Sequence, residues 1–487
     1  MEIDKHMRKV IDHLWGPTGS VILHIIIVIL LIKLLVFKHQ SDANVTVQMV
    51  EMEMVDIDKL DEVLDELEDV NEMEDIEPPL EDAPPDPSQF EDTPEMDITE
   101  LEVDTNFDGP LVLKDLFASR SSSGRRDGLN KYSDKWGRYT EPAVLLALDW
   151  LKEHQIKDGN RAGSWKPEGK FKNEEHYVAM AGIGLLAFLA HGETTGSEKY
   201  GETVELAIKY LRTRQEETGS NGAFCRLNQH GVYAHGIATY AMSEAYALTR
   251  IPYLEEVMNG AVRKIVRGQQ AGGGWDYKYS KGGRRDTSVA SWQIQALKAA
   301  FMAGCEVDGL KNAIKKASKD LKTNYMESGD FRYSNSRKSQ CSTSMGALCL
   351  QLIGHGRDDQ VLGAIKNMKD EQCKWEPNQG TWAMYKWYYL TQAKFHSGGN
   401  TWKQWNNDFA PAYIENQSKD GHWDPPTMVK KGHSERVVGP AFTTSLGALT
   451  LQVYYRFLPT YKEGALKKIE IDVDEDVIDE DIIIDII

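Results

Sequence analysis

The chain of 487 residues is 41% hydrophobic and 27% charged, with a formal net charge of −19. That charge is uneven: residues 41–110 carry 26 acidic residues against one lysine, and the stretch from Glu470 onward carries nine acidic residues and no basic one. The body between them, residues 111–469, has 50 basic and 37 acidic residues and no nucleic-acid recognition motif, so we expect no nucleic acid partner. Five cysteines without C-x2-C spacing give no disulfide framework or zinc ribbon.

The N-terminal region predicts a single membrane span. Residues 1–17 are short and polar and form a predicted cytoplasmic N-terminus, and Thr18–Phe37 reads TGSVILHIIIVILLIKLLVF. About 20 apolar residues cross a bilayer, so we expect a transmembrane helix over residues 18–39. Basic residues precede it and an acidic stretch follows, which predicts a cytoplasmic (inner) membrane protein with its body in the periplasm. A cleaved signal peptide and a buried soluble helix are the alternatives.

Ser20 and His24 lie one helical turn apart on this predicted span. Polar residues inside a span are costly and often functional, although they cost little near the headgroups. The spacing Ser-x3-His, followed by VTVQMVEMEMVDID and EPPLEDAPPDP, resembles the membrane anchor of TonB-type energy transducers. This resemblance implies that Ser20 and His24 contact an ExbB/ExbD-like proton-channel complex.

Three polar segments flank the predicted domain. Residues 40–115 are acidic, poor in aromatic residues and interrupted by proline, which is typical of a disordered, self-repelling tether. Residues 116–140 include SRSSSGRRDGLNKYSDKWGR and are expected to be a basic loop. Residues 466–487 form an acidic tail, which is either disordered or an edge strand in a complex.

Residues 141–465 predict one all-α domain. More apolar segments such as AGIGLLAFLA alternate with more charged ones such as GLKNAIKKASKDLKTN, so we expect inner and outer helices paired in hairpins. Gly or Pro separates most of the segments. The twelve predicted helices lie near residues 141–154, 175–191, 200–214, 232–249, 252–268, 286–304, 309–324, 341–354, 358–369, 381–397, 400–416 and 440–457.

A repeated pattern marks the joints between these hairpins. Gln269, Gly273 and Trp275 form Q-x3-G-x-W, and Gln417, Gly421 and Trp423 repeat it. Looser copies are Gln155 with Gly163 and Trp165, Gln215 with Gly222 and Phe224, and Tyr325 with Gly329 and Phe331. We expect the glycine to turn the chain at positive φ, the glutamine to bond backbone groups at a neighbouring helix terminus, and the tryptophan to fill the gap between hairpins.

This repeat resembles that of the squalene/hopene cyclase and protein prenyltransferase superfamily, in particular bacterial prenyltransferase/squalene-oxidase repeat proteins. The resemblance covers roughly residues 140–460 and includes VYAHGIATYAMSEAYALT, DTSVASWQIQALKAA and TSLGALTLQVYYRFLPTY. It implies an (α/α)6 toroid, with a cavity at one end of the inner helices. The whole chain is therefore predicted to be an all-α toroid with an N-terminal transmembrane helix and an acidic disordered tether.

The resemblance also bears on catalysis. Class II terpenoid cyclases use a D-x-D-D proton donor, and the corresponding place here reads GGRRDTSVASW. Asp286 aligns with the last Asp, but Arg285 stands where the donor would be, and a guanidinium cannot do that work. A D-V-D-E match at Asp472–Glu475 lies in the acidic tail. If the domain is an enzyme, Asp286 and His235 are the catalytic candidates; Asp286 is equally suited to cap its helix.

Aromatic and polar residues near the expected cavity are candidate ligand-binding residues, and simple packing is the alternative. They are His176, Tyr233, Trp292, Thr343, Tyr385, Trp387 and Thr444. Asp286, His235 and Cys341 would match a prenyltransferase-like zinc site only in residue type, so no metal or cofactor is predicted. Basic loops around Lys281 and Arg284 suit diphosphate or lipid head groups, or the chain's own acidic tether.

Two functions follow from these observations. The missing proton donor favours a membrane-anchored binding or scaffolding module, coupled to a TonB-type complex through Ser20 and His24. The alternative is a terpenoid cyclase or prenyltransferase-like enzyme acting on a polyisoprenoid or lipid through Asp286 and His235.

Overall fold

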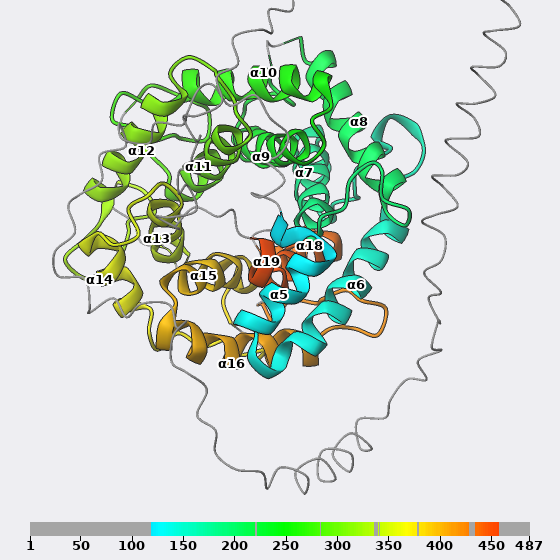
Figure 1. Ribbon diagram of the computed structural model, residues 1–487. Coiled ribbons are helices and arrows are strands. Elements are labelled where there is room, and N and C mark those ends of the chain that lie inside the picture. Colours follow the sequence, from blue (N-terminus) through cyan, green and yellow to red (C-terminus); the bar gives the residue numbers. More distant parts are fainter. Residues whose placement is uncertain are drawn as a thin grey trace, which may run out of the picture. The chain divides into compact units, whose positions relative to one another are not determined.

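The structure, a computed structural model, describes residues 118–219, 222–282, 284–335, 339, 341–376, 379–427 and 434–456. Within them, helices pair into six hairpins arranged in a ring, with one helix of each hairpin inside and one outside (Figure 1). The inner helices are α7 (Glu174–His191), α9 (Gly231–Thr249), α11 (Thr287–Met302), α13 (Ser342–Leu352), α15 (Ala383–Ser397) and α18 (Pro440–Leu451). The outer helices are α6 (Gly137–His154), α8 (Gly201–Glu217), α10 (Pro252–Gly268), α12 (Leu310–Asn324), α14 (Asp359–Asn367) and α16 (Gly399–Glu415).

The predicted all-α toroid is therefore confirmed for this part of the chain. Residues 18–39, with Ser20 and His24, lie outside the described residues, as do the acidic tether up to residue 115 and the acidic tail. None of the helices that the structure does describe has the length and apolar character needed to cross a membrane.

The inner and outer helices differ in composition because they differ in how many faces are covered. In α7 every residue from Met180 to His191 is buried, which matches its run of small and apolar side chains. Helix α12 instead buries one stripe, including Leu310, Ile314 and Leu321, and exposes its lysines. A helix that is apolar all round is typical of a fully enclosed element, and a striped one of an element at the surface.

The glutamine and tryptophan of each strict copy of the repeat join one hairpin to the next. Gln269 donates from Nε2 to the carbonyl oxygens of Gly273 and Ala313, both at 2.8 Å, which fixes the loop after α10 to α12. Trp275 is fully buried and donates from Nε1 to the carbonyl of Ile265 at 2.9 Å. Ala313 lies early in α12, so the partner is a carbonyl inside the next outer helix rather than an unpaired group at its end.

The second strict copy repeats this geometry and closes the ring. Gln417 donates to the carbonyl oxygens of Gly421 and Ala143, both at 2.8 Å, which joins the end of α16 to α6. Trp423 is fully buried and donates to the carbonyl of Tyr413 at 2.8 Å. The two tryptophans thus occupy equivalent surroundings, and the hairpins form a closed circle, as the repeat predicts.

The glycines of the two strict copies allow a close approach between hairpins. Gly273 and Gly421 have φ values of 103° and 100°. A Cβ atom at Gly273 would lie 2.0 Å from the carbonyl oxygen of Lys316, and one at Gly421 would lie 2.3 Å from that of Leu146. Any other residue would therefore be strained in its backbone and would push the next outer helix away.

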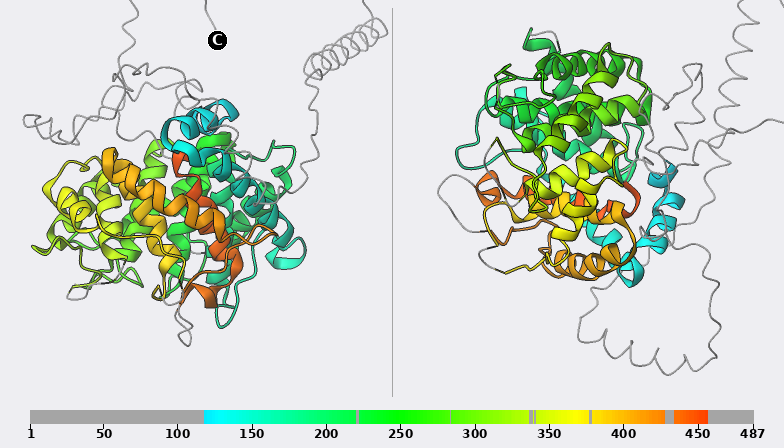
Figure 2. Two further views of the ribbon diagram at one scale, coloured as in Figure 1. Left: turned by 90° about the horizontal axis from the view of Figure 1, so that it is seen from below. Right: turned by 90° about the vertical axis from the view of Figure 1, so that its left-hand side faces the viewer.

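Because inner and outer helices alternate as antiparallel hairpins, all six inner helices run in the same direction. Short elements lie at the two ends of the ring (Figure 2). Next to the carboxyl ends of the inner helices are η3 (Ala118–Arg120), α5 (Ser122–Tyr132), η4 (Asp134–Trp136) and α19 (Val453–Arg456). At the amino ends lies α17 (Glu435–Val438), which contacts the start of α15.

The expectation of a basic loop over residues 116–140 is wrong for the residues described there. They form η3, α5, η4 and the first turn of α6. Helix α5 buries only Leu129, so it gives almost no apolar periodicity. Its N-cap Ser121 accepts from Gly124 N at 3.1 Å, and Arg125 holds it to the ring with donations to the carbonyls of Arg120 and His191.

Side chains of different inner helices meet inside the ring. Trp292 on α11 donates from Nε1 to the Tyr385 hydroxyl on α15 at 2.7 Å. Arg456 bonds the hydroxyls of Tyr240 on α9, at 3.2 Å, and Tyr388 on α15, at 2.9 Å. Helices α9 and α15 lie opposite each other in the ring (Figure 1). The interior is therefore bridged by direct contacts at these levels.

Candidate functional site

The most polar group at the amino ends of the inner helices surrounds Asp286. We call Tyr233, Tyr277, Arg284, Asp286 and Tyr333 the Asp286 cluster. The Asp286 side chain is fully buried and accepts from the Ser288 and Val289 backbone N–H groups at 3.2 and 3.1 Å, which makes it the N-cap of α11.

The other oxygen and the remaining acceptor sites of Asp286 are also occupied. The Tyr233 hydroxyl lies 3.4 Å from Oδ1, and Arg284 Nη2 lies 3.1 Å from Oδ2. A carboxyl group with these four partners is held in one fixed orientation. We therefore assign Asp286 to positioning the cluster, and the alternative of a helix cap is confirmed.

The cluster places tyrosine rings and one guanidinium at the amino ends of the inner helices. We call this end of the ring the mouth. The Arg284 guanidinium stacks on Tyr277 with 4.4 Å between its carbon and the ring centroid, and its side chain is 45% exposed. The hydroxyls of Tyr277 and Tyr333 bond each other. Burial and then the Asp286 charge raise the pKa of both Tyr233 and Tyr333, so both stay neutral hydrogen-bonding groups.

Beside this cluster, aromatic rings line the same end of the ring. Tyr385 stacks on Trp292 with 6.4 Å between centroids, and it packs edge-on against Trp382 and Tyr389. Trp292 and Tyr389 are buried, whereas Tyr385 and Trp382 are half-buried. We call Trp292, Trp382, Tyr385 and Tyr389 the aromatic floor, because the buried pair lies beneath the half-exposed pair.

Glu435 is a buried carboxyl at this end that sequence reasoning missed. Its oxygens accept from the Met384 and Tyr385 N–H groups at 3.0 and 3.1 Å, so α17 caps α15 from a distance. Burial raises the pKa of Glu435 to about 8, although these backbone N–H groups oppose the shift. Fifty residues separate the cap from its helix, and no local pattern marks such a pair.

Several predicted site residues lie between inner and outer helices instead of at the mouth. His235 is fully buried, places Nε2 3.2 Å from the Ala261 carbonyl on α10 and makes no hydrogen bond to Asp286 within the described residues. Burial lowers the pKa of His235 to about 4. Trp387 packs against Trp375 and Tyr413 with centroids 5.4 and 6.0 Å away.

Thr343 and Thr444 lie in equivalent places in their seams. Each hydroxyl accepts from the backbone N–H of the repeat's aromatic residue, Phe331 at 3.3 Å and Trp423 at 3.4 Å respectively. Both threonines therefore serve the joints between hairpins. A ligand-binding role for them and for Trp387, and a catalytic role for His235, stay predictions.

His176 lies at the start of α7, away from these seams. Its ring packs 5.1 Å from Phe171 and 4.9 Å from His230, centroid to centroid, and neither ring nitrogen has a hydrogen-bond partner within the described residues. Burial and then the neighbouring His230 lower the pKa of His176, which keeps it neutral at physiological pH. Of the predicted residues, Tyr233, Trp292 and Tyr385 are thus the ones that the structure brings to the mouth with Asp286.

Arg285, which stands where the resemblance to terpenoid cyclases would place a proton donor, points into a seam. Its Nη1 pairs with Asp320 Oδ1 at 2.7 Å, and its Nη2 donates to Asn324 Oδ1 at 2.6 Å. It joins the loop before α11 to α12. Among the described residues, no three His, Cys, Asp or Glu side chains are grouped closely enough to hold a metal ion.

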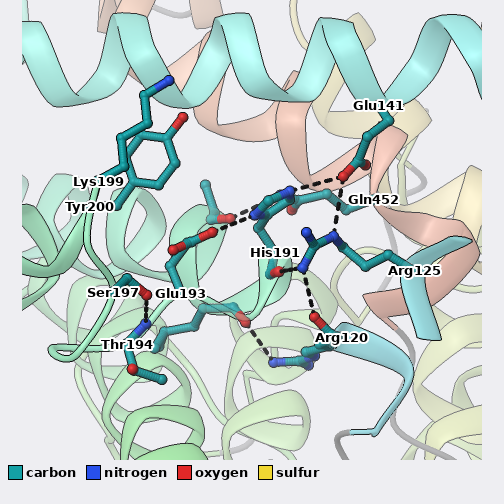
Figure 3. A network of polar contacts seen from close by, with 12 residues as sticks. Arg120, Arg125, Glu141, His191, Glu193, Thr194, Ser197, Lys199, Tyr200 and Gln452 are labelled. Carbon is teal, nitrogen blue, oxygen red and sulfur yellow. Dashed lines mark hydrogen bonds and ion pairs between the residues drawn. The ribbon is translucent and has the colours of Figure 1, made fainter. Parts of the chain in front are cut away.

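A second polar network lies at the opposite end of the ring (Figure 3). His191, buried at the end of α7, bridges Glu193 Oε1 at 2.7 Å and Glu141 Oε1 at 3.0 Å. Arg125 Nε lies 3.1 Å from the same Glu141 oxygen. Burial lowers the pKa of His191, but its bonds to the two carboxylates outweigh burial and raise it. The network ties α5 and α6 to α7.

Comparison with known proteins gives the arrangement of helices only. No protein-family model matches the chain, and no curated protein matches it. Solved structures that match include the α-1,6-mannanase GH76A of Salegentibacter sp. (12% identity, TM-score 0.47, covering 65% of this chain and 98% of that one) and a D-mannose isomerase (11%, 0.48, 66% and 98%). Cellobiose 2-epimerase from Bacillus thermoamylovorans also matches (12%, 0.45, 64% and 99%). Such identities carry no information about a substrate.

Proposed function

We propose that the toroid is a binding module whose ligand rests on the mouth formed by the Asp286 cluster and the aromatic floor. One observation carries this proposal: the Asp286 carboxylate, the candidate acid at the mouth, already has four hydrogen-bond partners. A cyclase must enclose its substrate around a free proton donor, whereas here that carboxylate is occupied, and the neighbouring Trp292 already donates to the Tyr385 hydroxyl at 2.7 Å.

The chemistry of the mouth suits an amphipathic ligand. Tyr277, Tyr385 and Trp382 are partly exposed aromatic side chains, and the Arg284 side chain beside them is 45% exposed. Aromatic faces bind the apolar part of a ligand, and a guanidinium binds a carboxylate or phosphate. A lipid or polyisoprenoid with an anionic head has both parts.

The test is native mass spectrometry of the full-length, detergent-purified protein, with farnesyl diphosphate as the added probe. We expect a bound adduct in the wild type, and about tenfold weaker binding after Arg284→Ala or Tyr385→Ala, from the loss of one charge-assisted or one aromatic contact. Arg212→Ala is the matched control, because Arg212 also stacks on a tyrosine (Tyr253, 4.7 Å) but on the outer ring. Equal binding by all variants would exclude the mouth as the binding site, and turnover of the probe would favour the alternative that the toroid is an enzyme.

We further propose that residues 18–39 anchor the module in the inner membrane with the toroid in the periplasm, and that Ser20 and His24 contact an ExbB/ExbD-like complex. The Ser-x3-His spacing and the charge asymmetry around the span support this. Ser20→Ala combined with His24→Ala is expected to abolish co-purification of a proton-channel partner. A partner that stays bound to the double variant, or none with the wild type, would remove the motor hypothesis.

Fewer observations support the alternative that the toroid is an enzyme. A terpenoid cyclase or prenyltransferase-like activity on a polyisoprenoid would need a free acid or base at the mouth. Within the described residues the buried carboxyl there with a strongly raised pKa is Glu435, which is bonded to the start of α15. Release of pyrophosphate from the same probe, lost in Glu435→Gln, would support this alternative over binding.

A further inference from the structure

A small recess lies on the ring axis at the carboxyl end of the inner helices, away from the mouth. Its volume is about 30 Å³, and its polar lining comprises Tyr240, Gln295, Lys298, Gln392, His396 and Arg456. None of the described residues that line it is acidic. A water molecule needs about 10–15 Å³, so the recess holds two or three water-sized groups.

Two cationic side chains face this recess without a direct ion pair among the described residues. Arg456 is buried and bonds two tyrosine hydroxyls and the Leu449 carbonyl, with no carboxylate at ion-pair distance among the described residues. Lys298 is half-buried and makes no hydrogen bond or ion pair within the same residues; its ammonium lies 5.8 Å from the Phe301 ring centroid. A cation taken out of water without a partner is costly.

The buried carboxylate of Glu244, on this side of the ring, already forms an ion pair. Glu244 on α9 receives both Nη1 and Nη2 of Arg120, at 2.9 and 3.1 Å, and both side chains are almost fully buried. Glu244 is therefore paired directly with Arg120 and acts on Arg456 only at longer range, and it is not an electrostatic partner of Lys298.

The carboxyl ends of the surrounding helices attract cations, and their last carbonyl groups need hydrogen-bond donors. This is an alternative explanation for the position of Lys298. Other side chains meet that need. Arg250 donates to the Ala303 carbonyl at the end of α11 at 2.8 Å, and Gln351 donates to the Ala393 carbonyl near the end of α15 at 3.0 Å. Lys298 is left facing the recess.

We propose that this recess binds one carboxylate group, held by Lys298 and Arg456. The amides of Gln295 and Gln392 form its polar wall, and Leu352 and Val453, which also line it, contact the attached carbon. Burial lowers the pKa of Lys298 to about 8 and that of His396 to about 4. A bound anion would oppose this effect of burial and raise the pKa of the lysine again.

Two sources can supply the carboxylate. One is a small free acid. The other is an acidic side chain of residues 466–487, which follow Arg456 closely in the chain and carry nine acidic residues from Glu470 onward. The recess and the mouth lie at opposite ends of the ring, so this proposal stands apart from the proposed function.

The experiment measures the thermal midpoint of the full-length protein while sodium methanesulfonate is replaced by sodium acetate at constant sodium concentration. The variants are Lys298→Met, Lys298→Gln and a chain whose nine tail acids are changed to Asn or Gln. The matched control is Lys311→Met, because Lys311 is exposed and lies 6.0 Å from the same Phe301 ring but does not line the recess.

If the acid is free, acetate should raise the midpoint of the wild type and of Lys311→Met by about 3 °C near ten times its dissociation constant, and should leave both Lys298 variants unchanged. If the tail supplies the group, the wild type should not respond, and the tail-neutralised chain should be less stable and regain the response through Lys298. The proposal would be overturned if acetate raised the midpoint of both Lys298 variants as well. It would also be overturned if acetate and methanesulfonate gave the same midpoint in every chain.

Discussion

The Gln417 amide donates to the Ala143 carbonyl across 274 positions of sequence at 2.8 Å. The same amide bonds its own loop at Gly421, also at 2.8 Å. One side chain therefore joins the last outer helix to the first and completes the ring. It makes the closure depend on a hydrogen bond that can be removed without touching the apolar core.

Removing this bond is expected to destabilise the ring. Gln417→Ala leaves two carbonyls without their donor and should lower the free energy of unfolding by about 1–3 kcal/mol. Gly421→Ala should cost more, because its backbone is at positive φ and its Cβ would meet Leu146 O at 2.3 Å. Urea unfolding measures both. Asn416→Ala is the control, since Asn416 bonds only Ala412 within its own helix, and an equal loss there would contradict the role of the seam.

Breaking the buried pair of Arg120 and Glu244 should cost about 3–5 kcal/mol, because each single change leaves an unpaired charge. Arg120→Met and Glu244→Met are therefore expected to be strongly destabilising. The double variant Arg120→Met with Glu244→Met should recover much of that loss. A double-mutant cycle by urea unfolding measures the coupling. Additive effects of the two changes would show that the pair contributes no coupling.

His235 should make the domain sensitive to acid. Its pKa is lowered by burial to about 4, against an ordinary value of 6.5. A histidine with a depressed pKa binds fewer protons when folded, so its contribution is present above pH 6.5 and is lost as the pH falls toward 4. His235→Phe should flatten that part of the curve of unfolding free energy against pH. NMR titration of the His235 ring gives an independent check; a midpoint near 6.5 would show that burial does not shift it.

Glu435 should have the opposite effect at higher pH. Burial raises its pKa from 4.5 to about 8, so the folded state binds more protons than the unfolded state between these values. Its contribution is present below pH 4.5 and is lost as the pH rises through 8. Glu435→Gln keeps one acceptor for the N–H groups of α15 and should remove this decline. If the wild-type stability is flat from pH 5 to 8 in urea, the carboxyl is ionised throughout.

The helices were largely predictable because burial dictates composition. The segments predicted at residues 286–304 and 309–324 correspond to α11 at Thr287–Met302 and α12 at Leu310–Asn324. The cap was also readable, since DTSVAS places Asp286 before its helix and the side chain accepts from Ser288 and Val289. Helix α5 escaped because its stability depends on Arg125 and on contacts with the ring.

The orientation of candidate residues could have been inferred more sharply. Residues two apart on a helix point about 200° from each other. Tyr233 and His235 therefore cannot both face the axis, nor can Tyr385 and Trp387; in each pair the first lies at the mouth and the second in a seam. Tyr277, Tyr333 and Glu435 had no signal, because only the closed ring brings their loops beside α11 and α15.

Arg120 donates to the carbonyl of Arg456 at 2.9 Å, so the chain enters and leaves the toroid at one point. A pull transmitted along the residues before Ala118 would load that point first, through Arg120, Arg125 and His191, and not the joints between hairpins. The ring of helices would then move as one unit, with the joints between its hairpins unloaded.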